Sequence, residues 1–180
     1  MVSYKVLRDY ILYWGTQVEN QSATTLINYI NHDRLPSLTV MLAASPTIGI
    51  WNLNASAIVM KQWFSLDAAG QRRTYNNPLF VGSLNNTFTL PAGFLLSADF
   101  NYQSRGQVQN ITLKRPQYTL NIGLRKSLFN DALSIEARAN DLLLGCKQEA
   151  LLYMESAQMK DLSWSCLLYT SPSPRDVEES

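Results

Sequence analysis

The sequence has little charge, a single histidine and no long apolar run. Charged residues make up 16% of the 180 residues, against about 25% in a typical soluble domain. The formal net charge of +1 and the scattered basic residues give no electrostatic preference for nucleic acid. No stretch of about 18 consecutive apolar residues occurs, which excludes a membrane-spanning helix. We therefore expect no nucleic-acid partner, and the 46% of apolar residues must lie in shorter segments.

Reactive side chains are few. His32 lies beside Asp33, and no GxSxG, HExxH, phosphate-loop or paired-carboxylate motif accompanies this pair. Cys146 and Cys166 give neither a disulfide framework nor the spacing of a metal site. A solvated loop pair is favoured for His32 and Asp33 over a catalytic pair at an outer rim. The sequence therefore predicts no catalytic, cofactor-binding or metal-binding residue, no cofactor and no enzymatic activity.

Apolar and polar residues alternate over most of the chain, as in β-strands with two different faces. In one segment Leu120, Ile122 and Leu124 fall on one face, while Asn121 and Arg125 fall on the other. The predicted strands cover 2–13, 38–50, 55–64, 79–90, 94–103, 118–128 and 133–140, and 23–30 is expected to extend a strand above a membrane. Strands of about ten residues are long enough to cross a bilayer when tilted. Their apolar face would meet lipid and their polar face a wet lumen.

Short and long connections alternate between these strands. Tight turns with Gly, Pro, Asn or Asp chemistry are predicted at Trp51–Asn54, Pro91–Gly93 and Phe129–Asp131. Longer polar segments are 15–37, 65–78, 104–116 and the part from 141 onward. This order is typical of outer-membrane barrels, whose short turns are periplasmic and whose long loops are outside. The sequence therefore predicts an all-β fold, an antiparallel meander of about seven to eight strands that forms a partial, open barrel wall.

Aromatic residues gather near the predicted strand ends. Those beside short turns are Trp51, Phe88, Phe94 and Phe129, and those beside long loops are Tyr10, Tyr13, Trp63, Phe64, Phe80, Tyr102 and Tyr118. Aromatic rings favour the headgroup level of a membrane, so the pattern predicts two girdles. A soluble β-sandwich, in which aromatic residues would lie in the middle of strands, is the alternative fold.

Charged residues of the predicted strands alternate onto inward faces. These residues are Asp99, Arg125, Glu136 and Arg138. Pairing across the sheet is favoured for them over ligand binding. The loop cations Arg72, Arg73, Lys114 and Arg115 are candidates for contact with lipopolysaccharide phosphates, although exposed loop cations are common. Pro46 cannot donate a ladder hydrogen bond and predicts a bulge.

Several segments together resemble one family. These segments are SPTIGIW (45–51), MKQWF (60–64), NNTFTLPAGFLLSADFNYQSRG (85–106) and LNIGLRKSLFNDALSIEARANDLL (120–143). They are similar to the barrel region of outer-membrane β-barrel proteins related to TonB-dependent (SusC-like) receptors of Gram-negative bacteria, over about Val2 to Leu162. Leu143 and Leu144 stand where the family usually has Phe and a turn residue, and Cys146 is atypical.

The resemblance implies a barrel in the cell outer membrane that mediates nutrient uptake. It also implies a plug domain, an inner-membrane energy-coupling protein and a surface lipoprotein as partners, besides the lipid itself. A structural or adhesive barrel without energy-coupled transport is the alternative function. The first residues, MVSYKVLRDY, lack the basic region and apolar core of a signal peptide. We therefore expect a barrel fragment, 1–165, that begins inside a longer protein and lacks its final strand.

The end of the chain has a different character. The stretch CLLYTSPSPRD (166–176) is similar to the translation of a transposase adapter used in DNA library preparation. The alternative is an ordinary Ser- and Pro-rich disordered terminus. We expect 166–180 to be a non-native, disordered tail, which would remove Cys166 from any chemical role.

Overall fold

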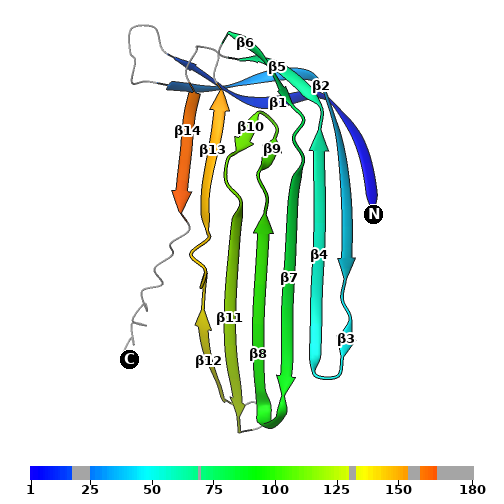
Figure 1. Cartoon of the computed structure of the whole chain (residues 1–180), viewed down its shortest axis with the longest axis vertical. Coiled ribbons are helices and arrows are strands. Elements are labelled where there is room, and N and C mark those ends of the chain that lie inside the picture. Colours follow the sequence, from blue (N-terminus) through cyan, green and yellow to red (C-terminus); the bar gives the residue numbers. More distant parts are fainter. Residues whose placement is uncertain (18–24, 69, 130–132, 154–158, 166–180) are drawn as a thin grey trace, which may run out of the picture.

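The largest sheet is an antiparallel meander that forms a tall wall (Figure 1). The computed structural model describes residues 1–17, 25–68, 70–129, 133–153 and 159–165. The wall has the order β1-β2-β4-β7-β8-β11-β12, with β3 paired to β4. Its strands are β1 (Val2–Gln17), β2 (Thr25–Ala44), β3 (Thr47–Ile48), β4 (Trp51–Gln62), β7 (Leu79–Leu90), β8 (Phe94–Gln103), β11 (Gln117–Leu128) and β12 (Leu133–Ala139). The predicted all-β meander is confirmed, and it is open: in the described ranges β1 pairs only with β2, and β12 only with β11.

Small hairpins extend the wall at one end. They are β5 (Phe64–Ala68) with β6 (Gln71–Tyr75), β9 (Gly106–Val108) with β10 (Ile111–Leu113), and β13 (Lys147–Tyr153) with β14 (Met159–Ser165). β10 also pairs with β13. Together with the far half of β1 and β2 they lie at the end opposite the short turns (Figure 1). Three segments expected as loops therefore contain strands, and the predicted extension of a strand at 23–30 is confirmed from Thr25 onward.

The first short turn lies before the position predicted for it. Ile48 pairs with Trp51, so the turn is Gly49-Ile50, and the predicted turn Trp51–Asn54 is wrong because those residues begin β4. Gly49 has a φ of +60°, a conformation that glycine adopts without the penalty of a side chain. The second turn lies where it was predicted, in the 3-10 turn Pro91–Gly93. The third falls largely outside the described residues.

Pro46 lies at an interruption between β2 and β3. Ala44 pairs with Ala55 before it, and Thr47 pairs with Asn52 after it. The same register holds on both sides, so no extra residue is inserted and the predicted bulge is wrong. The carbonyl of Pro46 accepts a hydrogen bond from the Leu53 N–H at 3.0 Å, which carries the pairing across the interruption.

The register sorts the wall side chains into two faces. Residues directly opposite each other on neighbouring strands share a face, and side chains alternate along each strand. One face is almost wholly apolar. Its rows include Leu42 and Ala44 of β2; Ala55, Ala57 and Val59 of β4; Phe80, Gly82, Leu84 and Phe88 of β7; Leu96, Ala98 and Phe100 of β8; Leu120, Ile122 and Leu124 of β11; and Ile135 and Ala137 of β12. The opposite face carries mostly Ser, Thr, Asn and Gln.

Two buried clusters lie on the polar side of the wall, near the hairpin end. One is formed by Leu12, Leu35, Phe64 and Tyr75. The other is formed by Leu79, Leu113 and Ala150, with Met60, Val81 and Ile111 packed against it. The hairpins therefore fold over the polar face. The apolar face carries no second sheet, since Ile122 is 37% and Leu124 is 42% exposed, and this excludes the sandwich.

The described residues form no helix with the length and hydropathy needed to span a membrane. The predicted tail, 166–180, lies outside the described residues. The boundary proposed at residue 165 therefore stays a prediction.

Candidate functional site

The apolar face is a continuous outward band. Ile122 lies between Ala98 and Ala139, and Leu124 lies between Leu96 and Ala137. Many large apolar side chains on this face are exposed, among them Val2, Tyr4, Leu42, Leu84, Ile122, Leu124 and Ile135. Leu96, Ala98 and Phe100 are half-buried by neighbours of the same rows. A contiguous apolar surface of this extent is rare in soluble monomers.

An aromatic girdle edges this band beside the short turns. The Trp51 and Phe88 rings stack with centroids 6.3 Å apart. The Trp51 indole N–H donates to the Asn86 side-chain oxygen at 3.0 Å, and the Asn86 amide donates to the Ala98 carbonyl at 3.2 Å. Asn86, a polar residue within an apolar row, is thereby satisfied. Beside Phe94, the ammonium of Lys126 lies 4.2 Å from the ring centroid and donates to the backbone of the turn.

A second girdle edges the band beside the hairpins. Phe80 and Tyr102 lie with ring centroids 6.0 Å apart, and Tyr118 pairs with Tyr102. From Phe94 to Tyr102 the eight residue steps of β8 span roughly 26 Å, close to the ~25 Å height of a barrel's apolar band. Two predicted members are wrong: Phe64 is buried in the polar-side cluster, and Tyr10 packs against it. The Tyr13 side chain is not among the described ones.

The polar face presents hydroxyl and amide groups. Ser56 and Ser83 share a hydrogen bond of 2.7 Å across β4 and β7. One rung runs through Asn54, Asn85, Asp99 and Asn121 on four neighbouring strands. Such a face suits contact with water or a polar solute.

The predicted inward charges all lie on this face, but only some of them pair. Glu136 and Arg138 form an ion pair of 3.0 Å on β12. Arg125 stands directly opposite Glu136, yet no ion pair of Arg125 or Asp99 is found in the described part of the chain. Gly123 provides room here, because a β-carbon on it would lie 2.6 Å from the Ser97 hydroxyl.

Three glutamines fasten the β9–β10 hairpin to the wall. Gln62 donates to the Gln109 carbonyl at 2.6 Å and accepts from the Gln109 N–H at 2.8 Å. The side-chain oxygen of Gln107 accepts from the N–H groups of Asn76 and Asn77 at 2.9 and 3.0 Å. The Gln109 side chain donates to the Tyr10 hydroxyl. The hairpin is thus held inward over the polar face, a feature that no sequence motif indicated.

A turn after β12 is fixed by Asp141. Its carboxylate accepts from the N–H groups of Gly145 and Cys146 at 3.1 and 3.3 Å, and its own N–H donates to the Asn121 side chain at 2.9 Å. The Gln117 amide donates to the Cys146 sulfur at 3.1 Å. Cys146 is disulfide-bonded, although no disulfide framework was expected.

The remaining candidates lie apart from one another. The His32 ring packs on Phe64, with centroids 5.2 Å apart, and no group of three or more His, Cys, Asp or Glu that could hold a metal is found in the described ranges. Arg72 stands opposite Asp67 at the β5–β6 hairpin. Arg115 pairs with Glu149 at 3.3 Å. Arg73 and Lys114 each make further contacts, so the four loop cations do not converge on one site.

The comparisons with known proteins agree with this geometry. The model of the outer membrane protein beta-barrel family matches residues 2–158. Neither a curated protein nor a solved structure matches the chain significantly. The matched range contains the entire wall, both girdles and the β9–β10 hairpin. The chain belongs to the outer membrane protein beta-barrel family, and its place is the outer membrane.

Proposed function

We propose that the chain forms part of the wall of a TonB-dependent receptor that takes up a nutrient across the outer membrane of a Gram-negative cell. The observation that carries the proposal is the polar face beneath inward-folded hairpins. A polar inner face under inward-folded hairpins suits a barrel that encloses water, a solute or a plug. The resemblance of segments such as 85–106 and 120–143 to TonB-dependent (SusC-like) receptors supports the same function.

The open edges of β1 and β12 support a larger barrel. An unpaired strand edge cannot face hydrocarbon, because each unsatisfied backbone group there costs several kcal/mol. We therefore propose that further strands lie beside β1 and β12. In the proposed receptor these belong to a wide barrel that holds a plug domain and works with an inner-membrane coupling protein and a surface lipoprotein. We propose no enzymatic activity and no cofactor.

Uptake measured with and without an energised inner membrane tests the proposal. Cells that carry the complete gene should accumulate the nutrient, and cells without the gene should not. Collapse of the proton gradient or loss of the coupling protein should abolish the accumulation. Uptake that continued without energy, or growth independent of the gene on every nutrient tried, would instead favour the structural or adhesive barrel.

A further inference from the structure

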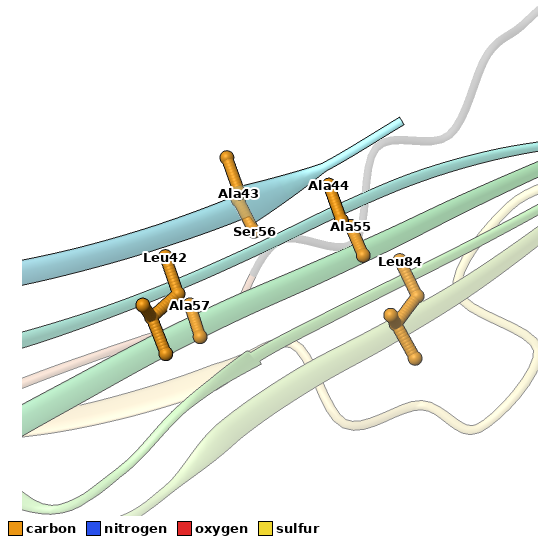
Figure 2. A pocket seen from close by; sticks show the side chains of 7 residues that line it. All are labelled: Leu42, Ala43, Ala44, Ala55, Ser56, Ala57 and Leu84. Carbon is orange, nitrogen blue, oxygen red and sulfur yellow. The ribbon is translucent and has the colours of Figure 1, made fainter. Parts of the chain in front are cut away.

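The membrane face is hollowed across β2, β4, β7 and β8. The lining of one hollow of about 330 Å³ includes Ala57, Phe80, Gly82, Leu84, Phe100 and Tyr102. The lining of an adjoining hollow of about 210 Å³ includes Leu42, Ala55, Ala57 and Leu84. Figure 2 shows Leu42, Ala55, Ala57 and Leu84 on the same side of the ribbons, which the register assigns to the membrane face. The hollows share Ser56, Ala57 and Leu84, so together they form one depression.

Small residues at the floor and large residues at the sides create this depression. Ala57 stands directly opposite Gly82, and Gly82 stands opposite Tyr102. The floor is low because these central positions carry a methyl group or no side chain at all. Phe100 and the girdle rings of Phe80 and Tyr102 rise on one side, and Leu42 rises on the other. The depression has the lining of an acyl-chain site, since its lining residues are apolar except for Ser56 and Ser83, whose side chains hydrogen-bond to each other.

A cation stands above the depression on the same face. Lys61 lies four residues beyond Ala57 on β4, which is roughly 13 Å along the strand. Its ammonium lies 5.4 Å from the Trp63 ring, and no acidic partner of Lys61 is found among the residues that the structure describes. Arg8 and Arg34 stand opposite each other farther along the wall, beyond Leu38, the partner of Lys61. Of these three cations, Lys61 therefore lies nearest the depression.

The orientation of the wall decides which lipid is available. The hairpin end carries the long connections and so faces the cell exterior, which places Lys61 and the upper part of the depression in the outer leaflet. We propose that this surface binds a phosphorylated, multiply acylated glycolipid of the outer leaflet, with one acyl chain in the depression and a phosphate on Lys61. The ammonium makes a charge-assisted contact with the phosphate. The acyl chain packs more closely in the depression than elsewhere on the wall, and the two contacts stabilise the bound lipid together. This site does not depend on the proposed transport.

Lipid retention by the complete barrel that contains this chain tests the site. That barrel is reconstituted in phosphatidylcholine nanodiscs doped with doubly phosphorylated lipid A, and native mass spectrometry counts the lipid A that is retained. Ala57→Phe fills the depression and Lys61→Gln removes the cation, so each should lower retention by about fivefold or more. Ala137→Phe and Lys126→Gln, on the same face but away from the depression, should leave it unchanged. With dephosphorylated lipid A, Lys61→Gln should have no effect.

Three results would overturn the site. The first is wild-type chain that retains no more lipid A than phosphatidylcholine. The second is equal retention by all four variants, and the third is an equal fall in all four. A loss that Lys61→Gln causes with and without phosphate would remove the assigned role of the ammonium. Circular dichroism of each variant verifies that it is folded, so that only folded variants are compared.

Discussion

At the scale of single residues, Asn86 shows how a membrane face accommodates a polar side chain. Its amide lies in an apolar row of β7, where an unsatisfied group would be costly. The indole N–H of Trp51 and the carbonyl of Ala98 complete its hydrogen bonds. Aromatic residues at this edge therefore do more than favour the headgroup level, because Trp51 also makes an asparagine tolerable near hydrocarbon.

Replacing Trp51 by Phe should expose that dependence. Trp51→Phe keeps an aromatic ring against Phe88 but removes the donor to Asn86, so we expect a loss of about 1–3 kcal/mol in the free energy of unfolding. Urea titration in lipid vesicles measures it. The double variant with Asn86→Leu should recover most of the loss, because no amide is then left unpaired. Additive losses in the double variant would show that the hydrogen bond is not the cause.

Adjacent residues of β7 offer a matched test of the two faces. Leu84 lies on the membrane face and Asn85 on the polar face, and both are exposed. In the complete barrel, Leu84→Arg should cost roughly 2–4 kcal/mol near the bilayer midplane, whereas Asn85→Arg should cost much less. Folding titrations of the two variants decide the matter. Equal costs would contradict the assignment of the faces.

At the scale of elements, the β9–β10 hairpin depends on a few polar contacts. Gln62 makes two hydrogen bonds to the backbone of Gln109, and apolar packing adds Leu113 against Leu79. The hairpin strands have only three residues each. Two-stranded pieces of this size are not stable alone, so the contacts with the wall, together with the pairing of β10 to β13, decide where the hairpin lies.

Gln62→Ala should loosen the hairpin and leave the wall intact. It removes both hydrogen bonds to Gln109, so backbone hydrogen exchange in 106–113 should become faster while exchange in β8 and β11 stays slow. Mass spectrometry after deuterium labelling in detergent measures both regions. Gln117→Ala, which removes a contact outside the hairpin, is the control. Faster exchange over the whole wall in Gln62→Ala would mean that the residue stabilises the sheet as such.

These elements also show what could be predicted from the sequence. Alternation identified the wall strands, because the two faces meet solvents of opposite character. The first turn was misplaced, since Asn52 and Asn54 carry turn chemistry while the decisive feature is the positive φ of Gly49. The β5–β6 and β9–β10 hairpins were missed because their strands of three to five residues show too few alternations to be recognised.

The position of the β9–β10 hairpin over the polar face could not be predicted, for a different reason. Gln62 and Gln109 lie 47 residues apart, and nothing local in either segment indicates the contact. Phe64 was assigned to the girdle for the same reason: it lies at a strand end, but Leu12, Leu35 and Tyr75 bury it on the other face. A position near a strand end does not show whether a side chain lies on the membrane face or on the polar face.

At the scale of the whole molecule, the two ends of the wall are chemically different. One end carries the turns Gly49-Ile50 and Pro91–Gly93, and the other carries every small hairpin (Figure 1). Family membership places the wall in the outer membrane, so the hairpin end should be outside.

Single cysteines at the two ends can verify the orientation. Arg72→Cys, at the β5–β6 hairpin, should react in intact cells with a membrane-impermeant maleimide. Ile48→Cys, beside the first turn, should react only after the outer membrane is permeabilised. Unmodified chain reports any background from its own cysteines. The reverse pattern of labelling would place the short turns outside and would also relocate the proposed lipid site to the inner leaflet.

The strand pairing of the wall limits how the number of strands in such a barrel can change. Every ladder between β2 and β12 keeps one register from turn to rim. A complete hairpin such as β7–β8 can therefore be duplicated or removed in a gene, and each remaining ladder keeps its partners and its two faces. A single-residue insertion within a strand would instead exchange lipid-facing and water-facing side chains beyond it. Selection should thus accept change in whole hairpins and in the loops, and reject odd insertions between the girdles.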